Sequence, residues 1–205
     1  LMNRPGVERR VYPGPPGYGY AMWFSLMLAC GSSPQPSPAE APAPKPDIVL
    51  VIVDTLRADH LGVYGHRRST STTMDALADQ GMWFHRSYAA SGWTLPSMAT
   101  LFSGLHPHQH LVGRLAFRGT EFGKLDASFT TVAEALGAVG YRSGAVVNNT
   151  FMAPEFQLDQ GFEMYDYQGA TNKEHRSAST TVDLGLKWLD AGPGPAFLVL
   201  HFMEP

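Results

Sequence analysis

The chain has 205 residues, 44% hydrophobic and 16% charged, which is enough for one globular domain with a substantial core. Its formal net charge is −3, so it has neither the basic field that nucleic-acid binding requires nor a strongly acidic one, and we expect no nucleic-acid partner. The single cysteine, Cys30, excludes an internal disulfide and needs another explanation.

The first 46 residues are predicted to lie outside the folded domain. Arginines precede an apolar run of nine residues at 21–29, which is too short to span a bilayer but suits the apolar region of a signal peptide. Residues 28–31 (LACG) resemble a bacterial lipoprotein cleavage box, in which the cysteine becomes lipidated. We therefore interpret residues 1–30 as a signal peptide that ends in the lipidation site Cys30. The alternative is a plain secretory signal in which Cys30 is incidental.

Residues 31–46 contain six prolines among serine and alanine. Such a composition is typical of an extended, disordered tether that holds a domain away from a membrane surface. Together with the lipid anchor, it predicts a lipoprotein of the bacterial cell envelope, on the periplasmic or extracellular face of the membrane.

From residue 47 to residue 205, strand and helix patterns alternate, which predicts one α/β domain. Residues 48–53 (IVLVIV) are apolar and rich in β-branched side chains, as expected of a strand that is buried on both faces of a largely parallel sheet. Asp54 lies at the carboxyl end of this strand, where open α/β sheets gather ligands and a carboxylate is well placed to hold a cation. A turn cap is the alternative role for Asp54.

Residues 73–80 predict a short helix, and residues 82–89 predict a strand that leads to Thr94. A helix should follow, because Pro96 suits a first helical turn and Gly104 can end the helix. Thr94 should then lie just ahead of the helix N-terminus, where free N–H groups and the helix dipole favour an anion that its hydroxyl can attack. Thr94 is therefore our candidate nucleophile, with a helix cap as the alternative role.

Three alternating histidines follow this helix, at positions 106, 108 and 110. Their spacing on an expected loop does not suit zinc, so we interpret them as structural. The rest of the chain predicts a helix over 130–138, a strand over 141–147, an irregular loop over 151–166, a helix over 179–191 with Val182, Leu186 and Leu189 facing inward, and a buried strand over 197–202.

Three motifs, in order along the chain, resemble the sulfatase family of the alkaline phosphatase superfamily: residues 54–59 (DTLRAD), 93–97 (WTLPS) and 103–108 (SGLHPH). The resemblance runs from about Pro46 to the last residue. It implies an alkaline-phosphatase-like three-layer sandwich with a largely parallel sheet, of which only the N-terminal part is present in residues 47–205. The remaining ligands of the site should lie beyond Pro205, so we expect the chain on its own to be inactive.

The resemblance also implies roles for individual residues. Asp54 and Thr94 would be ligands of one divalent metal ion, with Ca²⁺ expected because sulfatases usually use it, and Zn²⁺, Mn²⁺ or Mg²⁺ as alternatives found in phosphorus-acting relatives. Asn148 falls at the position where many arylsulfatases carry a lysine. His201 lies in the strand that leads into an active-site histidine of the family. We therefore predict that Asn148 and His201 bind substrate.

The sequence departs from the family at Thr94. Sulfatases make a formylglycine from the Cys or Ser of a Cys/Ser-x-Pro-x-Arg motif, whereas this chain has Thr94 at that position and Met98 in place of the arginine. Because threonine is not a precursor of that aldehyde, we expect no formylglycine. Thr55 stands where many sulfatases have a second aspartate, which leaves the expected metal site less acidic.

These features predict a metal-dependent, sulfatase-like hydrolase of sulfuric or phosphoric esters that acts on a small-molecule, glycan or lipid ester through a covalent intermediate on Thr94. A sulfated threonine cannot collapse by elimination, whereas phosphothreonine can be discharged by a second in-line displacement, so phosphoryl chemistry is mechanistically favoured. The alternatives are a phosphoryl-group transferase of the cell envelope and a non-catalytic sulfatase-like remnant that acts as a binding protein.

Overall fold

The computed structural model describes residues 44–114, 122–168 and 176–203. The expected signal peptide, the expected lipidation site Cys30, most of the expected tether and the last two residues lie outside the described residues. Among the described residues, no helix combines the length and the apolar character that crossing a membrane requires.

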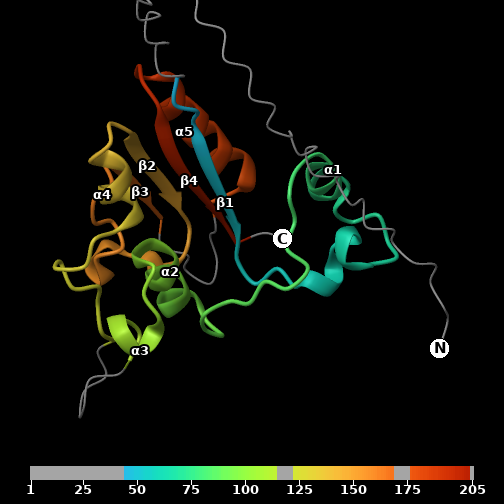
Figure 1. Cartoon of the computed structure of the whole chain (residues 1–205), viewed down its shortest axis with the longest axis horizontal. Helices are drawn as coiled ribbons and strands as arrows, with labels where there is room; N and C mark the ends of the chain where they lie inside the picture. The colour runs from blue at the N-terminus through green and yellow to red at the C-terminus, as the bar shows by residue number, and fades with distance from the viewer. Residues whose placement is uncertain (1–43, 115–121, 169–175, 204–205) are drawn as a thin grey trace, which may run out of the picture. The chain divides into compact units, whose positions relative to one another are not determined.

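In the described part of the chain, four parallel strands form the centre of the fold (Figure 1). The sequence prediction of a parallel α/β sheet is therefore confirmed. Because the strands run in the same direction, their carboxyl ends meet at one edge of the sheet. In spatial order, the strands are β1 (Ile48–Val53), β4 (Ala196–Phe202), β2 (Arg142–Val147) and β3 (Met164–Tyr167).

Helices lie on both faces of the sheet, which gives three layers (Figure 1). On one face, α5 (Ala178–Asp190) packs against β4 and β2. On the other face lie α2 (Thr94–Ser103) and α4 (Val132–Gly137). The remaining elements of the described residues are α1 (Thr72–Gln80), α3 (Pro107–His110) and short 3₁₀ turns at Ala58–His60, Gly62–Tyr64, Thr150–Met152 and Pro154–Phe156.

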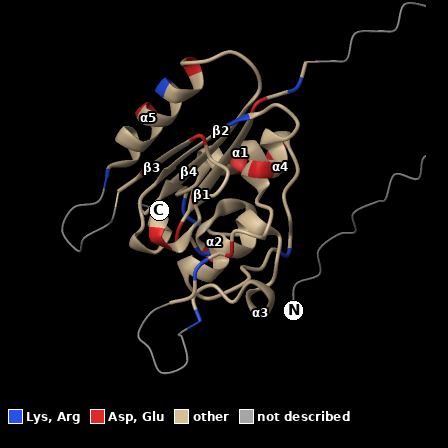
Figure 2. Ribbon diagram, turned by 90° about the vertical axis from the view of Figure 1, so that its left-hand side faces the viewer, with Lys and Arg blue, Asp and Glu red and all other residues tan. Residues whose placement is uncertain are grey.

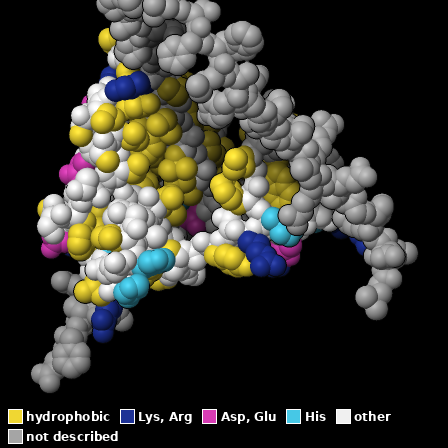
Figure 3. All heavy atoms as spheres, viewed as in Figure 1, with side chains coloured by type: hydrophobic (Ala, Val, Ile, Leu, Met, Phe, Trp, Pro, Cys, Tyr) yellow, Lys and Arg dark blue, Asp and Glu magenta, His cyan; other side chains and the backbone are white. Residues whose placement is uncertain are grey.

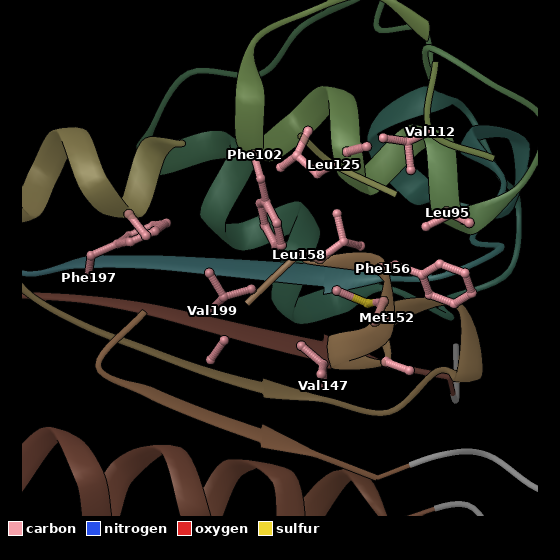
Figure 4. Close-up of a cluster of buried hydrophobic side chains, with 14 of the residues drawn as sticks. Leu95, Phe102, Val112, Leu125, Val147, Met152, Phe156, Leu158, Phe197 and Val199 are labelled. Carbon is pink, nitrogen blue, oxygen red and sulfur yellow. The ribbon is translucent and has the colours of Figure 1, made fainter. Parts of the chain in front are cut away.

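The alternation of side chains along each strand divides the core in two. Val147 of β2 and Val199 of β4 belong to the larger cluster, which includes Leu95 and Phe102 of α2 (Figure 4). Val146 belongs to the smaller cluster under α5. Successive residues of a strand point to opposite faces, so the parity of a residue number decides on which face its side chain lies.

The face that α5 turns to the sheet differs from the predicted one. Thr181 and Gly185 are buried, and a Cβ atom at Gly185 would come within 2.5 Å of the Leu200 side chain. Leu186, predicted to face inward, is 50% exposed, so that prediction is wrong. A close approach of a helix to a sheet selects small residues, which a search for apolar periodicity overlooks. The outer face of α5 carries charges of both signs (Figure 2).

Three further predictions are corrected. Residues 82–89 form no strand: Met82 is 83% exposed and none of the four strands pairs with this segment. β1 is not buried on both faces, because it lies at an edge of the sheet and leaves Val51 56% exposed. Its exposed side chains contribute to the hydrophobic surface in Figure 3. Residues 151–166, expected to be irregular, contain two 3₁₀ turns and the start of β3.

Candidate active site

Three polar residues lie on one face of the sheet at its carboxyl edge. Asp54 directly follows β1, Asn149 follows β2 by two residues, and His201 is the penultimate residue of β4. In each case, the residues two and four positions earlier in the chain belong to the larger core cluster or pack against it. Because side chains alternate along a strand, the three polar side chains face the same side of the sheet, toward α2. The strand pattern therefore brings these side chains to one place. The preceding residues of the three sets are Leu50 and Ile52, Ala145 and Val147, and Phe197 and Val199.

Thr94 reaches the same place from α2. It is the first residue of the helix, which thus begins one residue earlier than predicted, and Trp93 is the N-cap, with no side-chain cap hydrogen bond. The Thr94 hydroxyl donates to Oδ2 of Asp54, with Oγ1 and Oδ2 2.9 Å apart. A cap hydroxyl would instead bond a backbone N–H of its own helix. The geometry thus favours a site residue over a helix cap.

Aromatic packing fixes the segment before Thr94. The Trp93 ring meets Phe151 edge to face, with the ring centroids 5.1 Å apart, and lies 5.2 Å from the ring of Phe122. Such pairs stabilise packing beyond the area that they bury. Phe151 also follows Asn149 by two residues, so this cluster ties the start of α2 to the end of β2.

Asn149 contacts both Thr94 and Asp54. Its Nδ2 lies 2.9 Å from Oδ2 of Asp54 and 3.2 Å from Oγ1 of Thr94. Sequence reasoning missed this residue. The signal that identifies it is the alternation along β2, because Asn149 has the same parity as Ala145 and Val147, which face α2.

Asn148, the predicted substrate-binding residue, faces the opposite side of the sheet. It is 2% exposed, and its amide donates to Oγ1 of Thr181 at 2.9 Å and to the backbone carbonyl of His201. No hydrogen bond joins it to Thr94 or Asp54. The structure thus uses Asn148 to tie α5 to the ends of β2 and β4, and a role for it in binding substrate is not supported by its position.

His201 is fully buried beside Asp54. Its Nε2 atom lies 3.3 Å from Oδ2 of Asp54, within ion-pair distance when the ring is protonated. Among the residues that the structure describes, neither ring nitrogen has a partner with hydrogen-bond geometry. Buried polar atoms are normally paired, so this buried imidazole with unpaired nitrogens next to a carboxylate calls for an explanation. Substrate binding by His201 stays a prediction.

Asp54 is the electrostatic centre of the group. The adjacent His201 ring, together with hydrogen bonds from Thr94 and Asn149, holds the pKa of the Asp54 carboxyl below its ordinary value, although partial burial acts in the opposite direction. The carboxyl is therefore ionised at neutral pH. Its charge is what accepts the Thr94 hydroxyl and what would attract a cation.

The donor atoms fit part of the coordination shell of a divalent cation. Oδ2 of Asp54 takes the contacts from Thr94, Asn149 and His201, and Oδ1 takes no hydrogen bond among the described residues. Carboxylate and hydroxyl oxygens suit hard cations such as Ca²⁺ or Mg²⁺, and the buried His201 nitrogen suits Zn²⁺. The described residues contain no group of three or more His, Cys, Asp or Glu residues that could hold a metal, so they supply only part of a site.

Thr55 follows Asp54 in a strained conformation. Its φ of 61° lies in the left-handed region, where a β-branched residue is a genuine outlier. Aspartate tolerates this region better than threonine does. The backbone at this position is therefore better suited to the aspartate that many sulfatases carry than to the residue present here. Met98, at the place of the sulfatase arginine, packs against the larger core cluster.

The structural interpretation of the three histidines fits the geometry. They lie at α3 and its N-cap rather than on an irregular loop, and the rings of His106 and His108 stack. His110 is 3% exposed. Its Nδ1 accepts the backbone N–H of Val112, and its Nε2 lies 3.0 Å from Oγ1 of Thr100. His110 therefore holds the middle of α2 through its contact with Thr100, and it has no contact with the group around Asp54.

This arrangement defines an α/β domain of the alkaline-phosphatase-like type, with a helix-borne hydroxyl beside a carboxylate at the carboxyl edge of a parallel sheet. The model of the Sulfatase family matches residues 46–205. The chain belongs to the sulfatase family. Human arylsulfatase A is 36% identical over 98 residues, which are 48% of this chain and 19% of that protein.

Two solved structures show the same fold. The protein BT4656, solved with its substrate D-glucosamine-2-N,6-O-disulfate, superposes with a TM-score of 0.64 at 17% identity, over 78% of this chain and 34% of that one. The phosphonate monoester hydrolase of Agrobacterium radiobacter superposes with a TM-score of 0.58 at 22% identity, over 78% and 41%. The chain thus spans about a fifth of the length of the first curated relatives and about a third of the first structural neighbours.

Proposed function

We propose that the protein is a metal-dependent hydrolase of sulfuric or phosphoric esters in which Thr94 is the covalent nucleophile. The observation that carries the proposal is the 2.9 Å hydrogen bond from the Thr94 hydroxyl to the ionised Asp54 carboxylate, at the first residue of a helix. A hydroxyl held against a base, beside the positive end of a helix dipole, is arranged to attack an anionic ester.

In the first step, Oγ1 of Thr94 forms a bond to the phosphorus or sulfur atom, and its proton passes to Oδ2 of Asp54, to which it already points. The bond to the ester oxygen breaks, and the alcohol leaves with a proton from water. A divalent cation, when bound by Asp54 and Thr94, would lower the pKa of the hydroxyl and neutralise charge on the ester oxygens. The free N–H groups at the start of α2 would bind those oxygens.

In the second step, the hydroxide left by that water attacks the phosphothreonine in line, the bond to Oγ1 breaks, and Oγ1 recovers its proton from Asp54. This exit is open to a phosphorylated threonine, since phosphorus accepts a second in-line displacement. A sulfated formylglycine hydrate releases sulfate by elimination, and Thr94 cannot follow that route. We therefore favour phosphoryl over sulfuryl esters. The Agrobacterium phosphonate monoester hydrolase supports this preference only in that the fold is compatible with phosphorus chemistry.

Transfer of the phosphoryl group to an acceptor hydroxyl is the second candidate. The periplasmic domain of an Escherichia coli protein solved with zinc has a similar fold, with a TM-score of 0.58 at 14% identity. A transferase would use the same Thr94 intermediate and replace water by an alcohol. We also propose that the domain is tethered to the bacterial cell envelope through Cys30, which rests on the sequence of residues 1–46 alone.

Substitution of Thr94 in the natural full-length protein tests the nucleophile. With p-nitrophenyl sulfate, p-nitrophenyl phosphate and bis-p-nitrophenyl phosphate as probes, and Ca²⁺, Zn²⁺, Mn²⁺ or Mg²⁺ supplied, Thr94→Ala should lose at least about 1,000-fold in kcat. Thr94→Ser should keep part of the activity, because it retains the hydroxyl. Mass spectrometry of acid-quenched enzyme should find the group on the peptide that contains Thr94. Turnover of every probe at the original rate in Thr94→Ala would disprove the assignment.

A further inference from the structure

The orientation of the Asn149 amide is fixed by its surroundings. The backbone N–H of Phe151 donates to one end of the amide at 2.9 Å, and since an N–H must meet an acceptor, that end is Oδ1. The Nδ2 end therefore faces Oδ2 of Asp54 and Oγ1 of Thr94, and the side chain is 8% exposed. Sδ of Met203, 3.3 Å from Nδ2, completes the surroundings of the amide.

This orientation sets the direction of the Thr94 hydroxyl. A threonine hydroxyl has one proton and two lone pairs. The proton points to Asp54 and one lone pair accepts from Asn149, so the second lone pair is left for an incoming group. Without Asn149, the hydroxyl keeps only the bond to Asp54, and a second χ1 rotamer becomes accessible, because threonine commonly populates more than one.

We propose that Asn149 is a positioning residue. It holds the Thr94 hydroxyl so that its proton points to Asp54 and its reactive lone pair points toward the incoming group. This inference rests on the proposed function, in which Thr94 is the nucleophile. The amide does so without adding charge, so the carboxylate of Asp54 remains the only ionised partner of the hydroxyl among the described residues. Phe151 holds the amide in place through its N–H and contacts Trp93, the residue before Thr94, through its ring.

A purely structural role must be separated from this one. Asn149 is also the N-cap of the 3₁₀ turn at Thr150–Met152, where its Oδ1 accepts from Phe151. Serine is an equally good cap residue but cannot donate an N–H to Thr94. Asn149→Ser therefore keeps the cap and removes the amide N–H donor, whereas Asn149→Ala removes both. Comparison of these two variants isolates the contact with Thr94.

The test uses the full-length protein with p-nitrophenyl phosphate and bis-p-nitrophenyl phosphate. Asn149→Ser should lower kcat at least about 100-fold, as expected when a reacting group loses its alignment, while KM changes little and the melting temperature stays close to that of the wild type. A second readout needs no turnover: three-bond couplings to the ¹³C-labelled Thr94 methyl group should show one χ1 rotamer in the wild type and averaged rotamers in Asn149→Ser.

Other outcomes overturn the inference. An Asn149→Ser variant with unchanged kcat and one Thr94 rotamer would leave the nucleophile intact and remove the role of Asn149, provided that Thr94→Ala is inactive. If the activity of Asn149→Ser falls only in proportion to its melting temperature, and Asn149→Ala behaves in the same way, Asn149 acts as a cap alone. If Thr94→Ala turns over the probes at the original rate, the proposed function fails, and with it the role of Asn149.

Discussion

β1 and β4 are neighbouring parallel strands of similar apolar composition, yet they differ sharply in burial. Six of the seven residues of β4 are buried, whereas no residue of β1 is fully buried and three of its six are exposed. β4 has a strand on each side and helices on both faces, while β1 pairs with β4 alone among the described strands. An apolar run thus predicts a strand, but its burial is decided by partners elsewhere in the chain.

The same contrast separates two larger regions. The centre of the sheet, with α2 and α5, carries both core clusters and the residues around Asp54. Of the large apolar side chains that are exposed among the described residues, most lie at the β1 edge or in the segment from Met74 to Tyr88. Thr94, Asn149 and His201 therefore stand on the buried region, whereas Asp54 follows the exposed edge strand β1, and this matters because a catalytic group needs a supported position.

A matched pair of substitutions tests this contrast with the largest expected effect. Phe102 is 1% exposed in the larger core cluster, and Phe84 is 66% exposed in the open region. Phe102→Ala should lower the free energy of unfolding by about 3–5 kcal/mol, because it leaves a cavity. Phe84→Ala should change it by less than about 0.5 kcal/mol. Urea unfolding at one temperature measures both. An equal loss in the two variants would show that Phe84 is covered in the natural protein.

A buried histidine makes the stability of the central region depend on pH. Burial lowers the pKa of His110 from its ordinary value of 6.5, although a hydrogen bond to Pro96 opposes this. The folded state then binds a proton less readily than the unfolded state does, so stability is present above the ordinary pKa and is lost as the pH falls through it. Unfolding measured from about pH 7.5 to about pH 5.5 should show this loss.

Two variants identify the residue responsible. His110→Gln removes the titrating group and should flatten the dependence on pH, at a cost in stability at neutral pH from the changed contacts with Thr100 and Val112. His108→Gln replaces an exposed neighbour in the same short helix and should leave the slope as it is in the wild type. The assignment fails if the slope in His110→Gln equals that of the wild type.

Local patterns predicted most of the elements because each had a clear periodicity. The strand at 48–53 was placed at its observed bounds, the strand expected at 141–147 is observed at Arg142–Val147, and the helix expected at 179–191 is observed at Ala178–Asp190. The segment 82–89 misled for a physical reason. It has strand-like composition, but a strand also needs a partner, and the sequence of one segment does not reveal which other segment will lie beside it.

The candidate site was predicted only in part, and the reason is related. Asp54, Thr94 and His201 were selected from motifs, and the structure brings all three together. Asn148 and Asn149 are chemically identical neighbours, and only the parity of the strand separates them. An uncertainty of one residue, which is ordinary for element boundaries, exchanges the two faces of a sheet. The register in which β2 packs against α2 and α5 had to be observed.

The smallest expected effect concerns the strained residue where the two regions meet. Thr55→Asn should raise the free energy of unfolding by about 0.5–1 kcal/mol, because asparagine tolerates the left-handed conformation at φ 61° better than a β-branched residue does.

Thr55→Asp relieves the same strain but sets a second carboxylate beside Asp54. The two charges repel in the presence of a chelator and share a cation when one is bound, so the Asp variant should be the less stable of the two in chelator and the more stable in calcium. Melting curves of both variants, in chelator and in calcium, measure whether the order of their stabilities reverses. The same order in calcium and in chelator would mean that position 55 does not face the cation site, and a loss of stability in Thr55→Asn would mean that the Thr55 side chain makes a contact worth more than the strain that it causes.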